Sequence, residues 1–224
     1  MYEYRILNLY ACLGGNRYKW DEVLQAANIT NYKIVAVELD PELARLYQER
    51  FPNDIVIIAD AHQYLLDHYK EFDFIWTSPP CPSHSKARYW AFGKNGSKPE
   101  YPDMRLYQEI IFLQYHFFGK WVVENVNPYY KPMFDPQLRD RHTYWANFIF
   151  PKILSNRNDS ALVQASKMQD LCNFHDYDFR KYKGDQRLLK IARNLVDYEA
   201  GKTILATALN VQLKSKTKQT ELNF

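Results

Sequence analysis

The sequence has few cysteines, and their placement excludes two common classes of small protein. Its three cysteines, Cys12, Cys81 and Cys172, are too few and too widely spaced for a disulfide framework. No Cys-x-x-Cys pair and no cysteine and histidine cluster has the spacing of a zinc site. We therefore expect no metal, and we expect the reducing cytoplasm as the default location.

Long hydrophobic runs are also missing from the sequence. The first ten residues, MYEYRILNLY, lack the cationic start and long apolar core of a signal peptide. No segment is apolar for long enough to cross a bilayer, so we expect no membrane partner. The net charge of +3 is compatible with a nucleic-acid partner but too small to indicate one.

What the first half does contain is a regular alternation of strand-like and helix-like segments. Predicted strands cover residues 4–10, 32–39, 54–59, 72–77 and 120–126, and predicted helices cover residues 19–28, 41–51, 62–70 and 104–118. Short apolar strands that alternate with helices indicate a parallel sheet covered on both faces. The sequence therefore predicts an α/β fold, with any ligand beyond the carboxyl ends of the strands.

The second half is less regular. Residues 142–150 predict one or two strands, and residues 152–185 are polar and only weakly periodic. Residues 186–213 are strongly amphipathic and should be mostly helix, followed by a frayed tail.

Glycines and acids follow the first three predicted strands. Gly14 and Gly15 allow a backbone to approach a ligand closely, although glycines also end strands in ordinary turns. The full Gly-x-Gly-x-x-Gly is lacking, which argues against a standard dinucleotide site. Glu38 can accept hydrogen bonds from two ribose hydroxyls, and Asp60 can accept one from an adenine amino group. Taken singly, Glu38 also suits a solvated acid at a strand end, and Asp60 suits a helix cap. Together they describe a nucleoside-type cofactor lying across the sheet.

The stretch SPPCP, residues 78–82, ends the fourth predicted strand on a rigid turn. The prolines can serve only to stop the strand, and the cysteine only to fill a core. Alternatively, a Cys81 thiolate can add to carbon 6 of a pyrimidine and make carbon 5 nucleophilic. That chemistry needs an acid near ring nitrogen 3, and Glu124 ends the next strand on the same edge.

Taken together, these residues resemble the DNA (cytosine carbon-5) methyltransferase family. NLYACLGG (8–15) resembles its first motif and VELDPELARLYQERF (37–51) its second. FDFIWTSPPCPSHS (72–85) and KWVVENV (120–126) resemble its fourth and sixth motifs, in the usual order. The resemblance implies a Rossmann-like methyltransferase sheet, S-adenosylmethionine as methyl donor, Cys81 as nucleophile and Glu124 as the partner of nitrogen 3.

The resemblance also implies roles for other residues. Residues 136–148 are similar to the eighth motif, so Arg139 and Arg141, or Arg141 alone, would hold the cysteine loop and the target nucleotide. Tyr10 would stack on adenine. Residues 192–205 are similar to the tenth motif, which returns to the cofactor pocket. The cofactor-binding residues expected in all are Tyr10, Ala11, Cys12, Gly14, Gly15, Glu38, Leu39, Asp60, Ala61, Pro80, Asn194 and Val196.

The chain departs from the family pattern in places. Asn8 stands where aspartate is usual, Cys12 where glycine is usual and Pro82 where glutamine is common, and no clear ninth motif is present. We expect a catalytic and cofactor-binding domain at residues 1–151, a very small target-recognition region at 152–185, and a helical segment at 186–224 that completes the catalytic domain. This compact layout is most similar to phage-encoded orphan enzymes, which act in the bacterial or phage-infected host cell.

We expect double-stranded DNA as the partner of a monomeric enzyme, with the target base flipped out of the duplex. The long segment from Cys81 to Pro102 is expected to be a mobile lid, with Ser85, Lys86 and Arg88 contacting phosphates, although it can equally be a solvated loop. Three alternatives remain open: an RNA cytosine methyltransferase, another pyrimidine-modifying enzyme, and a degenerate DNA-binding protein without turnover.

Overall fold

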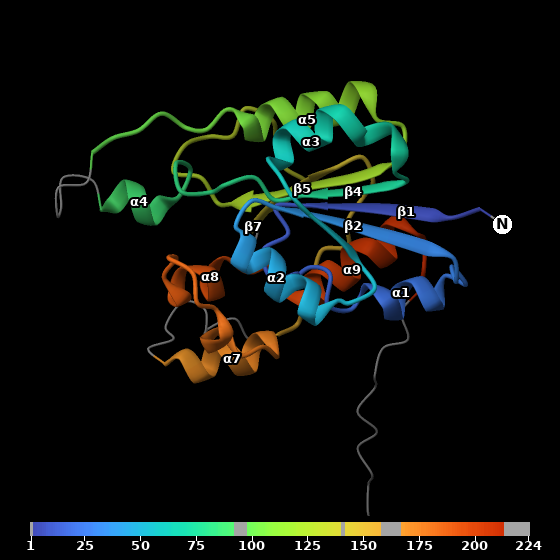
Figure 1. Cartoon of the computed structure of the whole chain (residues 1–224). Coiled ribbons are helices and arrows are strands. Elements are labelled where there is room, and N and C mark those ends of the chain that lie inside the picture. Colours follow the sequence, from blue (N-terminus) through green and yellow to red (C-terminus); the bar gives the residue numbers. More distant parts are fainter. Residues whose placement is uncertain (1, 92–97, 140–141, 158–166, 213–224) are drawn as a thin grey trace, which may run out of the picture.

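A seven-stranded sheet with helices on both faces forms the body of the molecule (Figure 1). The computed structural model describes residues 2–91, 98–139, 142–157 and 167–212. The strands are β1 (Tyr4–Leu9), β2 (Tyr32–Glu38), β3 (Ile55–Ile58), β4 (Phe74–Thr77), β5 (Lys120–Val126), β6 (Leu138–Arg139) and β7 (His142–Ala146). The helices are α1 (Trp20–Ala26), α2 (Pro41–Arg50), α3 (Ala61–His68), α4 (Lys86–Trp90), α5 (Arg105–His116), α7 (Met168–His175), α8 (Leu188–Asn194) and α9 (Tyr198–Ala208), with 3-10 turns at Tyr69–Glu71 and Phe179–Lys181.

The strands lie in the order β3-β2-β1-β4-β5-β7-β6. Strands β1 to β5 are parallel, and β7 runs antiparallel between β5 and β6. The expected α/β, Rossmann-like class is therefore confirmed. The chain leaves β1 in one direction through β2 and β3 and then in the other through β4 and β5. Ligands bind beyond the strand ends at such a point of reversal.

Both faces of the sheet are buried, because successive strand residues point to opposite faces and both sets are apolar. Ile75 and Val123 join the hydrophobic cluster beneath α3 and α5. Phe74 and Val122 join the cluster formed with α1 and α9 on the other face (Figure 1). This double cover fixes the strand ends, and so fixes the side chains that follow them.

The amphipathic segment near the C-terminus forms two helices, α8 and α9, instead of one. The break lies at Leu195 to Asp197, where the Asp197 carboxylate accepts a hydrogen bond from the Glu199 N–H at 3.1 Å and begins α9. Helix α9 packs on α1, and the Trp20 indole N–H donates to the Gly201 carbonyl at 3.2 Å. Helix α9 is thus packed against the main sheet through α1.

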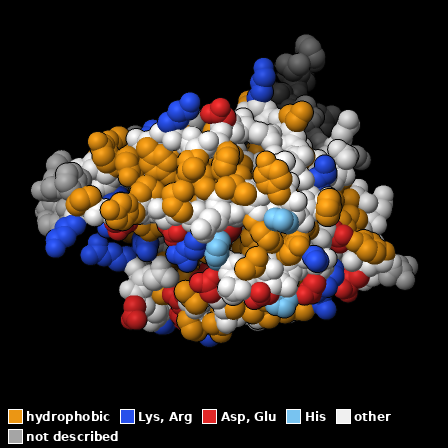
Figure 2. All heavy atoms as spheres, turned by 90° about the horizontal axis from the view of Figure 1, so that it is seen from above, with side chains coloured by type: hydrophobic (Ala, Val, Ile, Leu, Met, Phe, Trp, Pro, Cys, Tyr) orange, Lys and Arg blue, Asp and Glu red, His pale blue; other side chains and the backbone are white. Residues whose placement is uncertain are grey.

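The outer face of α3 and α5 carries hydrophobic side chains at its surface. Figure 2 shows them gathered in a band on this side of the molecule. Exposed members on or next to α5 include Met104, Ile111, Tyr115 and Phe118. Within the described ranges, no helix is both long enough and apolar enough to cross a membrane.

Candidate active site

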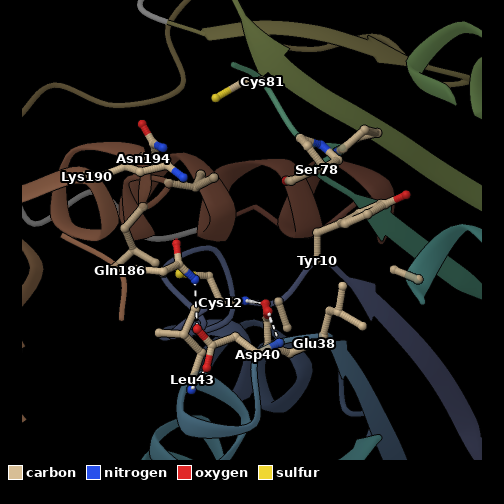
Figure 3. Close-up of a pocket in the computed structure, with 18 of the residues that line it drawn as sticks. Tyr10, Cys12, Glu38, Asp40, Leu43, Ser78, Cys81, Gln186, Lys190 and Asn194 are labelled. Carbon is tan, nitrogen blue, oxygen red and sulfur yellow. Dashed lines mark hydrogen bonds between the residues drawn. The ribbon is translucent and has the colours of Figure 1, made fainter. Parts of the chain in front are cut away.

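A cavity of about 810 Å³ lies at the carboxyl edge of the sheet. Its walls come from residues that follow β1, β2, β3, β4 and β5, together with residues 182–186 and 190–196. Cys81 lies at one end, and Glu38 and Asp40 lie at the other (Figure 3). The volume is within the range of cofactor sites.

The cavity brings together almost all of the expected cofactor residues with two of the four expected catalytic residues, Cys81 and Glu124. The expected residues that line it are Tyr10, Ala11, Cys12, Gly15, Glu38, Leu39, Asp60, Ala61, Pro80, Asn194 and Val196. Gly14 is not among the lining residues. It adopts φ +65°, and a Cβ there would lie 2.4 Å from a ring carbon of Phe51 and 2.7 Å from one of Tyr47. Glycine is required there for a left-handed turn packed against α2, not for contact with a ligand.

Gly15 lines the cavity and also lies against the segment between α8 and α9. A Cβ at Gly15 would lie 2.4 Å from the Val196 carbonyl oxygen and 2.6 Å from Leu195 Cγ. The missing side chain therefore admits the segment between α8 and α9 against the loop after β1. The close approach is between two parts of the chain.

Glu38 ties the first two strand ends together. Its Oε2 accepts a hydrogen bond from the Cys12 N–H at 2.8 Å, and its Oε1 accepts one from the Asp40 N–H at 2.9 Å (Figure 3). Burial raises the pKa of Glu38 despite these bonds. Each carboxylate oxygen has a second lone pair, so the group can still accept hydrogen bonds from a ligand.

Tyr10 is held by a buried acid that the sequence analysis missed. Its hydroxyl donates to Glu109 Oε1 at 2.6 Å, and burial and the nearby Glu109 charge raise the pKa of the phenol. Glu109 is only 1% exposed and also accepts from the Thr77 hydroxyl at 2.5 Å. His62 Nδ1 lies 2.9 Å from the same carboxylate. One signal was available, because Glu109 falls on the otherwise apolar face of the α5 sequence.

Asp60 caps a helix and also lies at the cavity. Its side chain accepts from the Gln63 N–H at 3.1 Å and so begins α3, yet it also lines the cavity. Arg105 Nη1 lies 3.9 Å from its other oxygen.

Asp40 joins the cavity to the region assigned to target recognition. Its Oδ1 accepts from the N–H groups of Glu42 and Leu43 and caps α2. Its Oδ2 accepts from the Tyr182 hydroxyl and from Gln186 Nε2, both at 2.8 Å (Figure 3). Residues 182–185 therefore form part of the cavity wall, and residues of α7 pack on α2 in one hydrophobic cluster. This packing was not anticipated.

The turn that carries Cys81 is held from several sides. Asn125 Nδ2 donates to the Pro79 carbonyl at 2.9 Å, and the His84 N–H donates to the Cys81 carbonyl at 3.0 Å. His84 is fully buried, with Nδ1 2.6 Å from the Tyr130 hydroxyl. The prolines thus end β4 within a braced turn, and the side chain at its tip lines the cavity.

The surroundings of the Cys81 thiol favour its protonated form. Burial and the negative charge of Glu124 raise its pKa to about 11, while Lys190 acts in the opposite direction.

The segment after Cys81 contains a short helix that the sequence did not predict. The Ser85 hydroxyl accepts from the Ala87 N–H at 3.2 Å and caps the short helix α4. Tyr89 stacks on Tyr129 with 4.7 Å between ring centroids, and Arg88 forms an ion pair of 2.6 Å with Glu100. No local sequence pattern indicates this helix, because the contacts that stabilise it come from a distant loop.

The arginines of the expected eighth motif are placed only in part. Arg139 belongs to β6, where it pairs in register with Thr143, and Arg141 lies outside the described residues. The next residue, His142, lines the cavity, and its Nδ1 contacts Glu124 Oε1. The sequence analysis did not identify His142 as a site residue.

The two departures in the first motif have different surroundings. Asn8 is fully buried, accepts from Asn16 Nδ2 at 2.8 Å and does not line the cavity. Cys12 does line it, with φ +48°, a conformation that favours the glycine usual there. Burial and the Glu38 charge raise the pKa of Cys12 to about 12. Within the described part of the chain, no group of three or more His, Cys, Asp and Glu residues is placed to hold a metal ion.

The chain is similar to known proteins over part of its length. The family model described as C-5 cytosine-specific DNA methylase matches residues 4–132. A search of curated proteins found no match. Among solved structures, a DNMT2 mutant from Spodoptera frugiperda is 26% identical with a TM-score of 0.37, over 55% of this chain and 35% of that one. A putative DNA modification methyltransferase encoded within a prophage of E. coli is 16% identical with a TM-score of 0.37, over 57% of this chain and 33% of that one.

The matched regions are only about a third of these two proteins' own lengths, and their scores are low. The family assignment therefore depends on the sequence match, which covers more than half of the 224 residues. That family uses S-adenosylmethionine as methyl donor. The chain belongs to the C-5 cytosine-specific DNA methylase family.

Proposed function

We propose that this protein transfers a methyl group from S-adenosylmethionine to carbon 5 of cytosine in double-stranded DNA through a covalent adduct with Cys81. One observation carries the proposal: Cys81 and Glu124, from neighbouring strands, line one cavity with Glu38 and Tyr10. A nucleophile, an acid and a nucleoside site then share one space.

The chemistry of the cavity suits this cofactor. Glu38 offers carboxylate oxygens to two ribose hydroxyls, Tyr10 offers a ring to adenine, and Asp60 offers an acceptor to its amino group. S-adenosylmethionine supplies an electrophilic methyl group. Because Glu38 and Cys81 lie at opposite ends of the cavity, the reacting carbon must lie toward Cys81 (Figure 3).

Cys81 and Glu124 divide the work on the ring. The Cys81 sulfur loses its proton and bonds to carbon 6, while the displaced electron pair moves toward nitrogen 3. Glu124 gives nitrogen 3 a proton, which offsets the developing negative charge. Carbon 5 then gains the methyl group and loses its hydrogen as a proton, the bond from sulfur to carbon 6 breaks, and nitrogen 3 returns its proton. One proton is released per turnover.

Duplex DNA is the proposed substrate because the family match is to DNA methylases. The target carbon is inaccessible in a stacked duplex, so the base has to be flipped into the cavity. Helix α4 follows Cys81 closely in sequence, and its cations Lys86 and Arg88 suit phosphate contacts. We keep the monomer, the phage-type origin and target recognition by residues 152–185 as parts of this proposal.

Methyl transfer from labelled cofactor to unmethylated duplex DNA tests the proposal. We expect 5-methylcytosine in digested DNA by mass spectrometry, and a denaturation-resistant complex with DNA containing 5-fluorocytosine. Cys81→Ala should abolish both signals. Cys172→Ala is the matched control, because Cys172 is also buried but does not line the cavity.

Two outcomes would contradict the proposal. Methylation that survives Cys81→Ala would remove the covalent mechanism. Label found in RNA but not in duplex DNA would favour the RNA alternative, and bisulfite sequencing of methylated DNA would give the sequence context.

A further inference from the structure

Glu124 has a histidine as its close neighbour inside the cavity. His142 Nδ1 contacts Glu124 Oε1, and the two side chains are only 10% and 6% exposed. The contact crosses from β5 to its antiparallel neighbour β7, where Val126 pairs with His142. Both residues line the cavity together with Cys81.

The histidine ring is held in this position. It stacks on Tyr144 of the same strand, with 6.4 Å between centroids and 23° between planes. The adjacent Thr143 hydroxyl donates to Asn127 Oδ1 at 2.8 Å, which ties β7 to the residue after β5. The ring therefore fixes one oxygen of Glu124 and leaves the other for a ligand.

A carboxyl group that gives a proton to nitrogen 3 must first obtain that proton. Glutamic acid is ionised at neutral pH in water, whereas histidine changes charge close to neutral pH. A buried carboxylate paired with an imidazolium costs less than an isolated buried carboxylate. A histidine in contact with Glu124 is therefore a suitable local source of the proton.

The charges around the pair favour the same arrangement. The ionisable side chains that line the cavity include Cys81, Glu124 and Lys190, and the Lys190 charge lowers the pKa of Cys81. The Glu124 charge raises the pKa of Cys81. A proton on His142 would partly offset that charge, so it would assist thiolate formation as well as protonation of the ring.

We propose that His142 is a positioning residue for the target base, which holds Glu124 through Nδ1 and supplies the proton that Glu124 gives to nitrogen 3. This inference rests on the proposed function. When the bond from the Cys81 sulfur to carbon 6 forms, one proton passes from Nδ1 to Glu124 Oε1, the carboxyl group turns, and the same proton passes from that oxygen to nitrogen 3. When that bond breaks, the proton returns by the same route, and none is consumed.

His142→Asn and His142→Gln test the inference, because an amide can hold Glu124 but cannot supply a proton at neutral pH. We expect kcat for DNA methylation to fall about 100-fold at neutral pH, the size typical of a lost general acid. The deficit should shrink as the pH is lowered, since protons from solvent are then more available to the site. The KM for S-adenosylmethionine should be unchanged.

Two further variants isolate the effect. His68→Gln is the matched control, because His68 also contacts a glutamate, Glu71, but lies at the surface and outside the cavity lining. The double variant with Glu124→Gln should lose no more activity than Glu124→Gln alone, because both residues act on one proton.

The failures of the two proposals are distinguishable. A parent protein without cytosine methylation overturns the proposed function and this inference together. An active parent overturns the inference alone if His142→Asn and His142→Gln keep kcat within about threefold, a far smaller loss than a general acid normally causes. A loss that is equal at every pH also overturns it, because that is the signature of a structural role.

Discussion

The surroundings of Cys81 determine how much of its thiol is ionised. Burial and Glu124 hold its pKa at about 11, so nearly all of the thiol is protonated at neutral pH. Removing the Glu124 charge should lower that pKa and increase the thiolate fraction at any given pH. Glu124→Gln should therefore speed alkylation of Cys81 by iodoacetamide, by about threefold for each unit by which the pKa falls, because the larger thiolate fraction is partly offset by a weaker nucleophile.

Peptide mapping by mass spectrometry would measure this alkylation separately at each of the three cysteines. Cys172 should label at the same rate in both proteins, because it does not line the cavity. Glu71→Gln is the control for loss of a glutamate elsewhere. Equal labelling of Cys81 in the parent and in Glu124→Gln would show that Glu124 does not control the thiol.

The sequence predicts some of these residues and not others for a physical reason. Glu38, Cys81 and Glu124 each follow an apolar strand, and the ends of parallel strands meet at one edge. Glu109 and His142 acquire their roles from contacts between distant elements. No local pattern reports that α5 brings Glu109 under Tyr10, or that β7 brings His142 beside Glu124.

Among the elements, the segment from α7 to residue 186 is the one whose place differs most from expectation. It packs on α2 and reaches the cavity through Asp40. Burial alone would raise the pKa of Asp40, but hydrogen bonds from Gln186, Tyr182 and backbone N–H groups lower it overall. Because the pKa of Asp40 is lower in the folded chain, its ionisation stabilises the fold at pH values above the pKa of the unfolded chain. This stabilisation is lost as the pH falls through the pKa of the folded chain.

Tyr182→Phe tests whether this segment supports cofactor binding. The change removes only the hydroxyl that donates to Asp40, a bond of about 0.5–1.5 kcal/mol. We expect the Kd for S-adenosylmethionine in calorimetry to rise by about 2–10-fold. Tyr2→Phe is the control, since Tyr2 also donates to an aspartate, Asp73, but outside the cavity lining. Unchanged affinity in Tyr182→Phe would show that the hydrogen bond from Tyr182 to Asp40 does not support cofactor binding.

Strands β1 to β5 and helices α1, α2, α3 and α5 were predictable, because their apolar periods are clear. Two elements were not. Helix α4 has a polar sequence and depends on Tyr129 across the stack. The break between α8 and α9 is hidden because the amphipathic pattern continues through Leu195 and Val196. Both features depend on tertiary contacts instead of local preference.

For the molecule as a whole, a net charge of +3 is small, so DNA binding would depend on where the cationic side chains lie. Lys86 and Arg88 on α4 are expected to contact phosphates, although Arg88 also forms an ion pair with Glu100. Changing both to alanine should weaken DNA binding and reduce the dependence of log K on log salt by about 0.9 for each phosphate that the protein no longer neutralises. Fluorescence anisotropy across a salt series would measure both effects.

Cofactor affinity and thermal stability should not change in this double variant, because neither side chain lines the cavity. Lys202→Ala is a control, since Lys202 is a cation on α9 paired with Glu22. A double variant with the parent's DNA affinity and salt slope would exclude α4 from the DNA-binding surface. The chemistry proposed for Cys81 would be unaffected by that result.

The close approach of Gly15 to Val196 has a consequence for how the protein is made. On the ribosome, β1 and β2 can pair early, since N-terminal parts fold first during synthesis. The cavity wall beside Gly15 cannot form until Leu195 and Val196 have emerged. A ligand stabilises only chains that can bind it, so the methyl donor would protect finished chains and leave interrupted ones to proteolysis. A small metabolite would then mark which copies have been completely translated past residue 196.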